Sequence, residues 1–237
     1  MKRIAIAVIM VTNIIVAISV AEALERKHIS MIDSDQLTIE TQISGPGGDE
    51  HFNLVWWIPI EFWQAIFARD KTTSEFDKKN IITALNPYSL LAVCQADISS
   101  LGAFRFYNKD EIEKSLSVNF KDRNGNLSRV NPPKDIDPDI EVLIGIFKPI
   151  LSAAAGNMGQ NFHFFVLKDY DSSGTRRMDP YSTGTIKFHL AKRSGELIET
   201  QLDFPLNSLY IPRRCPNGKE AHVTWRYCPW TGKKLED

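Results

Sequence analysis

Three side chains in the second half of the chain have the types needed for acid–base chemistry. His163 lies within an apolar run, and Asp169 and Asp171 follow at its end. An imidazole and two carboxylates can exchange protons with a substrate when they converge on one cleft. The chain has no His-Glu-x-x-His, no Gly-x-Ser-x-Gly and no phosphate-binding loop. These residues therefore support only an alternative hypothesis, a hydrolase with dispersed catalytic groups, and a hydrogen-bonded core histidine is the simpler interpretation of His163.

Two other groups of side chains point to binding. Arg176 and Arg177 fall in a long polar loop that joins two predicted strands, where their guanidinium groups would hold an anionic ligand if the loop is functional. Trp56, Trp57 and Trp63 belong to an aromatic stretch that would line an apolar groove for a sugar or lipid. Adjacent tryptophans in a strand face opposite sides, so one of the first two is directed to a second layer or to solvent. The simpler alternatives are a solvated loop and an aromatic core.

The first 23 residues predict an export signal. A short positive start, Lys2 and Arg3, precedes an apolar run over 4–20, and Ala-Glu-Ala supplies the small residues of a cleavage site. We therefore expect the mature chain to begin at Leu24, to be periplasmic or secreted, and to have no membrane span. A retained anchor is the alternative, although this run is shorter than the roughly 20 apolar residues of a spanning helix.

Length and composition describe an ordinary globular chain. Hydrophobic residues make up 43% and charged residues 24% of the sequence, and the net charge is −1. Removing Lys2, Arg3 and Glu22 leaves −2 for the mature form. This balance gives no basic excess for nucleic acid and no polybasic stretch for a membrane surface. With no cofactor fingerprint either, we expect no nucleic-acid partner and no cofactor.

Two cysteines stand in matched settings near the end of the chain. Cys215-Pro-Asn-Gly and Cys228-Pro-Trp-Thr-Gly each begin with Cys-Pro and then reach a glycine. The segment 215–235 resembles a zinc ribbon, in which two Cys-x-x-Cys-Gly knuckles hold one metal ion. The second cysteine of each knuckle is missing, because Gly218 and Thr231 stand in those places. Structural zinc normally takes four nitrogen or sulfur ligands.

The resemblance favours a disulfide over a metal. A zinc ribbon brings its two knuckles together, so Cys215 and Cys228 would be placed to oxidise in an oxidising compartment. We therefore predict a Cys215–Cys228 disulfide that staples the tail. The alternative is a degenerate zinc-binding module with Cys215, His222 and Cys228 as ligands. Cys94, in an apolar segment, is expected to be a buried free thiol.

The elements that would position these residues interleave helices and strands. Apolar spacing, with Pro and Gly as breaks, predicts strands over 37–43, 51–58, 88–96, 104–107, 117–120, 127–130, 161–168, 185–191 and 197–204, and helices over 59–69, 74–86, 109–116 and 138–155. The nearly continuous apolar run over 161–168 predicts a central strand covered on both faces. Many of the links are hairpins, which favours an α+β fold with a largely antiparallel sheet and three or four helices.

Taken together, the sequence predicts a cleaved signal over 1–23, an α+β domain over 24–210 and a cysteine-bridged hairpin in a tail over 211–237. For function it favours an exported, non-enzymatic binding or envelope-associated protein, with a cell-envelope protein or a small ligand as partner. The hydrolase and the degenerate zinc module are the alternatives. A cleft that unites the histidine and aspartates would favour the hydrolase, whereas separation of these groups and a broad exposed aromatic patch would favour binding.

Overall fold

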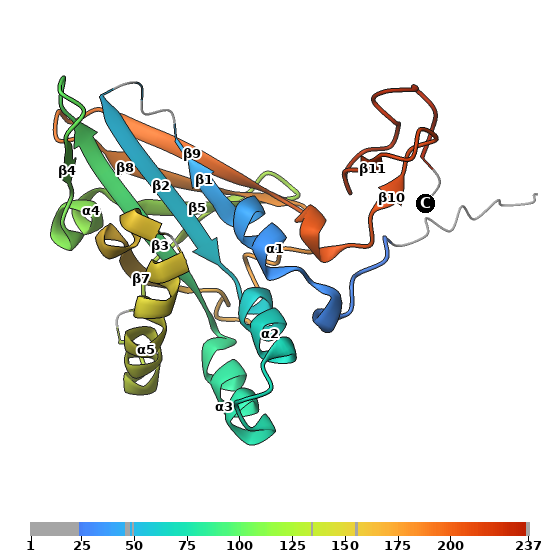
Figure 1. Cartoon of the computed structure of the whole chain (residues 1–237), viewed down its shortest axis with the longest axis horizontal. Coiled ribbons are helices and arrows are strands. Elements are labelled where there is room, and N and C mark those ends of the chain that lie inside the picture. Colours follow the sequence, from blue (N-terminus) through green and yellow to red (C-terminus); the bar gives the residue numbers. More distant parts are fainter. Residues whose placement is uncertain (1–23, 46–47, 49, 134, 155, 236–237) are drawn as a thin grey trace, which may run out of the picture.

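Two antiparallel sheets packed against each other form the body of the protein (Figure 1). The structure is a computed structural model that describes residues 24–235 except 46–47, 49, 134 and 155. The predicted export signal lies outside the described residues. Helices and antiparallel sheets together confirm the α+β class.

The first sheet is built around its longest strand. It contains β1 (Gln42–Ser44), β2 (His51–Ile58), β3 (Tyr88–Ile98), β4 (Phe104–Phe106) and β7 (His163–Lys168). β2 pairs with one edge of β3, while β7 and β4 share its other edge, at residues 88–93 and 96–98 respectively. The central, fully covered strand is therefore β3, in which eight consecutive residues are buried.

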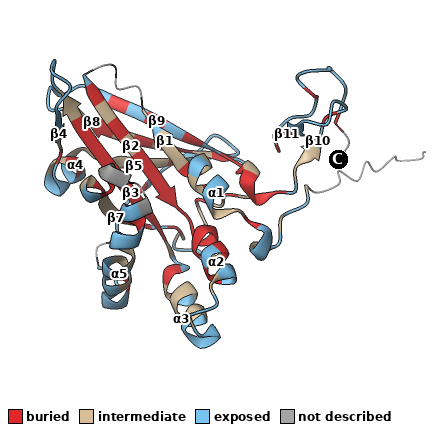
Figure 2. Cartoon of the chain, in the orientation of Figure 1, coloured by how far each residue is buried: buried red, intermediate tan, exposed pale blue. Residues whose placement is uncertain are grey.

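The second sheet shows the alternation expected of a sheet with one wet face. Its order is β6 (Leu127–Val130), β5 (Ser117–Asp122), β8 (Gly184–Ala191) and β9 (Leu197–Phe204). Buried and less buried residues alternate along β8 and β9 (Figure 2). The inner face meets the first sheet, and the rings of Trp57 and Phe204 lie 5.1 Å apart across the interface.

Five α-helices accompany the sheets in the described part of the chain. They are α1 (Ser34–Thr41), α2 (Ile60–Arg69), α3 (Glu75–Leu85), α4 (Lys109–Ser115) and α5 (Pro138–Ala154), with short 3-10 turns η1 (Ile29–Met31), η2 (Gly156–Asn161) and η3 (Asn207–Leu209). Side chains cap the first turns of two of these helices. Ser74 accepts the Asp77 backbone N–H at the start of α3, and Asn108 forms a capping box with Glu111 at α4.

Two predicted strands are wrong in their placement. The segment 37–43 is mostly the helix α1, and only its last two residues belong to β1. Asp33 caps the backbone N–H groups of Asp35 and Gln36, and the helix buries Leu37 and Thr41 on one face while Ile39 is exposed. The apolar run over 161–168 forms β7, which pairs with β3 alone among the described strands and so lies at an edge.

The tail has a small buried cluster of its own. β10 (Arg213–Arg214) and β11 (Glu220–Ala221) form a short hairpin, and Cys215, Ala221, Cys228 and Leu235 pack together separately from the main core. Asn207 Oδ1 accepts the Val223 backbone N–H and links the tail to η3. Within the described residues, no helix has the length and hydrophobicity required to cross a bilayer.

Candidate functional site

An apolar groove lies where α1, α2 and α5 meet the outer face of β2. Its volume is about 530 Å³. The strand geometry explains how it forms, because Trp57 faces the second sheet and the adjacent Trp56 faces α2. Of the three tryptophans predicted to bind a ligand, Trp56 and Trp63 line this groove and Trp57 does not.

Packed aromatic rings form the inner wall of the groove. Phe62 meets Trp56 edge-on at 5.6 Å and Trp63 at 5.3 Å, and the Trp63 ring lies 4.5 Å from Phe147. We call this site the aromatic groove; its apolar lining residues are Ile39, Trp56, Phe62, Trp63, Ile66, Phe67, Phe147, Ile150 and Leu151. Such ring pairs add stability beyond the area that they bury, so the rings of the wall support one another.

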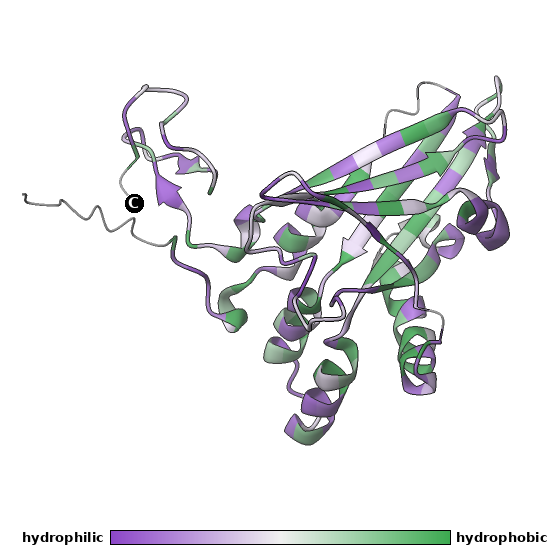
Figure 3. Ribbon diagram, turned by 180° about the vertical axis from the view of Figure 1, so that it is seen from behind, coloured by the Kyte–Doolittle hydropathy of each residue, from purple (hydrophilic) through white to green (hydrophobic). Residues whose placement is uncertain are grey.

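The mouth of the groove is unusually apolar for a protein surface. Ile39 is 74% exposed, Ile66 38% and Ile150 63%, from three different helices. Ile150 also continues a row on α5, since Val142 and Ile146 precede it at four-residue spacing and are both more than half exposed. Figure 3 shows α5 as a largely hydrophobic helix that projects from the body. Contiguous apolar surface of this kind marks binding sites.

The indole nitrogens of the two adjacent tryptophans differ in their hydrogen bonding. The indole Nε1 of Trp56 is buried without a hydrogen-bond partner among the described residues. By contrast, Nε1 of Trp57 donates to Ser89 Oγ at 3.0 Å. Buried donors are normally paired, so this Trp56 N–H carries the cost of an unsatisfied group.

Carboxylates stand at the rim of the groove. Asp35 and Asp70 both line its edge. Hydrogen bonds from Thr72 and Thr73 hold the pKa of Asp70 well below its usual range, so it is ionised at neutral pH. The rim therefore disfavours an anionic head group.

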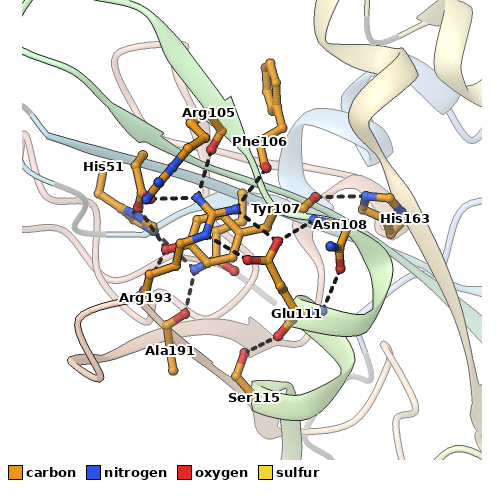
Figure 4. Close-up of polar contacts among 12 residues, drawn as sticks. His51, Arg105, Phe106, Tyr107, Asn108, Glu111, Ser115, His163, Ala191 and Arg193 are labelled. Carbon is orange, nitrogen blue, oxygen red and sulfur yellow. Dashed lines mark hydrogen bonds and ion pairs between the residues drawn. The ribbon is translucent and has the colours of Figure 1, made fainter.

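A second cluster, at the opposite end of β3, is polar. We call it the Asp97 network; its members are His51, Gln95, Asp97, Arg105, Tyr107, Glu111 and Arg193 (Figure 4). Asp97 accepts hydrogen bonds from Tyr107 at 2.8 Å and from Arg193 at 2.7 Å. Arg193 also binds Glu111 through Nε at 2.7 Å and stacks 3.8 Å from the Tyr107 ring.

The ionised groups in the Asp97 network neutralise one another. Hydrogen bonds from Arg193 and the Asn108 backbone lower the pKa of Glu111 to about 2. Although burial would raise the pKa of Asp97, hydrogen bonds from Arg105, Arg193 and Tyr107 hold it well below its usual range. Each charge thus has an internal partner, and the network ties the β8–β9 turn to β4 and α4.

His51 is the one member of the network with a basic ring. Gln95 Nε2 lies 3.2 Å from His51 Nε2 and donates to the Ala191 carbonyl at 3.0 Å. Because an amide nitrogen only donates, His51 Nε2 must accept, and Nδ1–H donates to Asp97 at 3.3 Å. Burial lowers the pKa of His51, which favours this neutral ring.

The structure does not bring the predicted hydrolase residues together. His163 and Asp169 stand six residues apart, near opposite ends of β7, roughly 20 Å at the rise of a strand. His163 Nε2 bonds to the Tyr107 carbonyl at 3.0 Å. Asp171 accepts the Ser173 and Thr175 backbone N–H groups in an exposed turn. Each group therefore has a local structural role.

The predicted anion-binding arginines also have internal partners. Arg176 binds Glu61 through both terminal nitrogens, at 2.6 and 3.0 Å, and Asp169 through Nε at 2.8 Å. Burial raises the pKa of Asp169, and the Arg176 guanidinium opposes that effect. Arg177 contacts the Arg129 carbonyl at 3.5 Å. The loop is thus pinned to α2 by a buried ion pair, and Arg176 does not present its charge to a ligand.

The two tail cysteines are adjacent but not bonded. Their sulfurs lie 2.6 Å apart and both residues are buried, so the predicted disulfide is not formed in this structure. Burial raises the pKa of Cys215 to about 11. Burial would also raise the pKa of Cys228, but hydrogen bonds from Cys215, Thr231 and the Trp230 backbone outweigh it and lower the value to about 7.

No metal-ligand set forms around the tail cysteines. His222 Nδ1 is paired with Thr224 Oγ1 at 2.9 Å, and its ring faces Trp225. In the described part of the chain, no three His, Cys, Asp or Glu residues cluster so as to hold a metal. Cys94 is buried as expected, and burial raises its pKa to about 11.

Sequence reasoning found two tryptophans of the groove but missed its outer parts. Ile39 was assigned to a strand, and the pattern of α5 does not reveal which of its apolar residues remain exposed. The Asp97 network was missed entirely because its members come from five separate segments. Comparisons of this chain with family models, curated proteins and solved structures found no match, so its function rests on this geometry alone.

Proposed function

We propose that this chain is an exported, non-enzymatic binding protein whose ligand is an apolar or amphipathic small molecule. The observation that carries the proposal is the aromatic groove, an apolar site of about 530 Å³. Small-molecule sites are typically about 300–1,000 Å³ and lined by hydrophobic and aromatic side chains with a few polar groups. The three exposed isoleucines at its mouth would be covered by such a ligand.

The polar groups of the site narrow the ligand class. The Asp35 and Asp70 carboxylates at the rim favour a neutral or cationic head group. The unpaired Trp56 N–H favours a ligand with an acceptor oxygen, since pairing would remove the cost of a buried, unsatisfied donor. The proposed ligand therefore has an apolar body, an acceptor oxygen and no negative charge.

Binding of the fluorescent apolar probe N-phenyl-1-naphthylamine to residues 24–237 tests the site. Ile150→Glu places a charge at the mouth, and we expect the probe affinity to fall about tenfold or more, since a carboxylate is costly to desolvate. Leu197→Glu is the matched control, because Leu197 is 71% exposed on β9, outside the groove.

The head-group preference has its own test. Dodecyltrimethylammonium should displace the probe at a lower concentration than dodecanoate does. Equal loss of binding in Ile150→Glu and Leu197→Glu, or no saturable binding, would contradict the groove as the site.

Export and the tail disulfide are part of the same proposal. The apolar N-terminal sequence supports export, and the adjacency of Cys215 and Cys228 supports their oxidation outside the cytoplasm. Denatured mass spectrometry of the protein recovered from the exporting host should give a chain that starts at Leu24. Its mass should rise by two hydrogens on reduction. A chain that still contains residues 1–23 would contradict cleavage of the export signal. A mass unchanged by reductant would contradict the disulfide.

A further inference from the structure

The charge of this protein is divided unevenly between its body and its tail. Residues 24–210 contain 20 Lys and Arg against 25 Asp and Glu, whereas residues 211–237 contain six against three. The near-neutral total conceals an acidic body and a basic tail. Five of the tail cations, Arg214, Lys219, Arg226, Lys233 and Lys234, are exposed. A basic segment on an acidic protein indicates a polyanionic partner.

Exposed aromatic rings accompany these cations. Trp225 is 36% exposed, Tyr227 60% and Trp230 48%. The Trp225 and Trp230 rings lie 5.8 Å apart, and Lys219 Nζ lies 4.8 Å from the centre of the Trp230 ring. Tyr227 pairs with Lys234 through a β-bridge. Trp and Tyr beside Lys and Arg are the residues that proteins place at the interface between lipid and water.

The tail lies at the point where the apolar N-terminal sequence joins the body. Leu24, which directly follows residues 1–23, lines one cavity together with Trp225, Arg226 and Tyr227. The next residues run beside the start of the tail, since Arg26 forms a β-bridge with Tyr210 and the Lys27 N–H donates to the Leu209 carbonyl. Before cleavage, any membrane engaged by the apolar sequence over 4–20 would therefore meet this end of the protein.

We propose that the tail is a peripheral docking surface for a bilayer that contains anionic phospholipid. Its exposed cations attract the phosphate groups, and Trp225, Tyr227 and Trp230 insert at head-group depth. The surface is distinct from the aromatic groove, which lies among α1, α2 and α5. The tail holds the exported protein at an envelope membrane, while the groove remains open to its ligand.

Vesicle sedimentation of residues 24–237, which lack the apolar N-terminal sequence, tests the proposal. We expect binding to phosphatidylcholine vesicles that contain phosphatidylglycerol, and little binding to phosphatidylcholine alone. The Lys233→Gln/Lys234→Gln variant should have a vesicle partition coefficient about 30-fold lower than the parent. Each cation near the surface contributes about fivefold, and the variant removes two of them. Raising the salt from about 0.1 M to about 1 M should release the protein, because the screening length falls to about 3 Å.

Matched substitutions on the body distinguish binding through the tail from nonspecific binding of the protein to vesicles. Lys71→Gln/Lys79→Gln removes two exposed cations from outside the tail, and Phe76→Ala removes a 73%-exposed ring. Both variants should bind vesicles as the parent does, whereas Trp230→Ala should bind less. Equal binding to neutral vesicles, or an equal effect of the body and tail variants, would overturn the proposal. So would binding of single-stranded oligonucleotides without binding of vesicles.

Discussion

The Asp97 network and the aromatic groove sit at opposite ends of the first sheet and differ in how far their charged and apolar groups are covered by the rest of the protein. In the Asp97 network, Arg193 alone makes contacts to two carboxylates, two backbone carbonyls and a ring face. In the aromatic groove, three isoleucines from different helices face outward. Among the described residues, the buried Trp56 N–H of the groove and Gln95 Oε1 of the network both lack a hydrogen-bond partner, so the exposed apolar surface is what separates the two regions. The first region holds segments together, and the second has surface left to cover.

This difference shows that a high density of ionisable groups does not by itself identify a functional site. Perturbed pKa values occur in structural ion-pair networks as well as in active sites. The lowered pKa values of Asp97 and Glu111 follow from Arg105 and Arg193, which belong to the same network. Uncovered apolar area is the more informative signal here.

The largest expected effect comes from removing the centre of the Asp97 network. Arg193→Met should lower the free energy of unfolding by about 2 kcal/mol, because it removes the hydrogen bonds that this one side chain makes to Asp97, Glu111 and two backbone carbonyls, and its contact with the Tyr107 ring. Urea unfolding measures the change. Probe binding at the aromatic groove should stay as in the parent. A loss of probe binding without a loss of stability would break the comparison, because it would make the network part of a site.

Substitutions of the adjacent Trp56 and Trp57 should have a smaller effect on stability, and they test the comparison more directly. Trp56→Phe and Trp57→Phe remove the same atoms, but only the second leaves a buried hydroxyl, Ser89 Oγ, without its donor. Trp57→Phe should therefore be about 1–2 kcal/mol less stable than Trp56→Phe. Only Trp56→Phe should weaken probe binding, since Trp57 faces the other sheet. Equal stability of the two variants, or weaker probe binding in Trp57→Phe, would remove the distinction between the two tryptophans.

The sequence was sufficient for most of the fold because its local signals agree. Pro59, Ser74 and Pro138 mark helix starts, and the Asn-Gly turn before β6 is confirmed with Gly125 at positive φ. The strand predicted over 37–43 is wrong because a short alternation of apolar and polar residues is also compatible with a helix. Here the Asp33 side chain caps that helix at its N-terminus. The prediction that β7 is a central strand is wrong because helices and loops can bury an edge strand. Its sequence is then as apolar as that of a central strand.

The sites were less accessible from sequence because they depend on contacts between distant segments. Arg176 looked available as an anion binder, and only the fold places Glu61, 115 residues away, against it. The Asp97 network likewise joins residues separated by up to 96 positions. The basic tail was visible in the sequence, but the net charge of the whole chain averaged it away.

The smallest expected effect is the pH dependence of stability, which arises in the Asp97 network and leaves the aromatic groove unchanged. Burial lowers the pKa of His51 below its model-compound value of 6.5, with Asp97 and Glu196 opposing and Lys192 assisting. The folded protein therefore binds fewer protons than the unfolded chain as pH falls through 6.5, so His51 contributes stability above that pH and loses it below. Asp97 stays ionised throughout, and the pKa of His163 is lowered in the same sense.

Urea unfolding between about pH 8 and pH 5 should show stability falling with acidity, with a slope that His51→Asn reduces and His163 partly maintains. Protonation would force His51 Nε2 to become a donor facing the Gln95 amide nitrogen, which also donates. None of the described residues that line the aromatic groove is a histidine, so probe affinity should stay constant over the range in which the protein remains folded. A probe affinity that follows the same pH curve as stability would show that the two regions are coupled, and the separation between a structural network and a binding groove would fail.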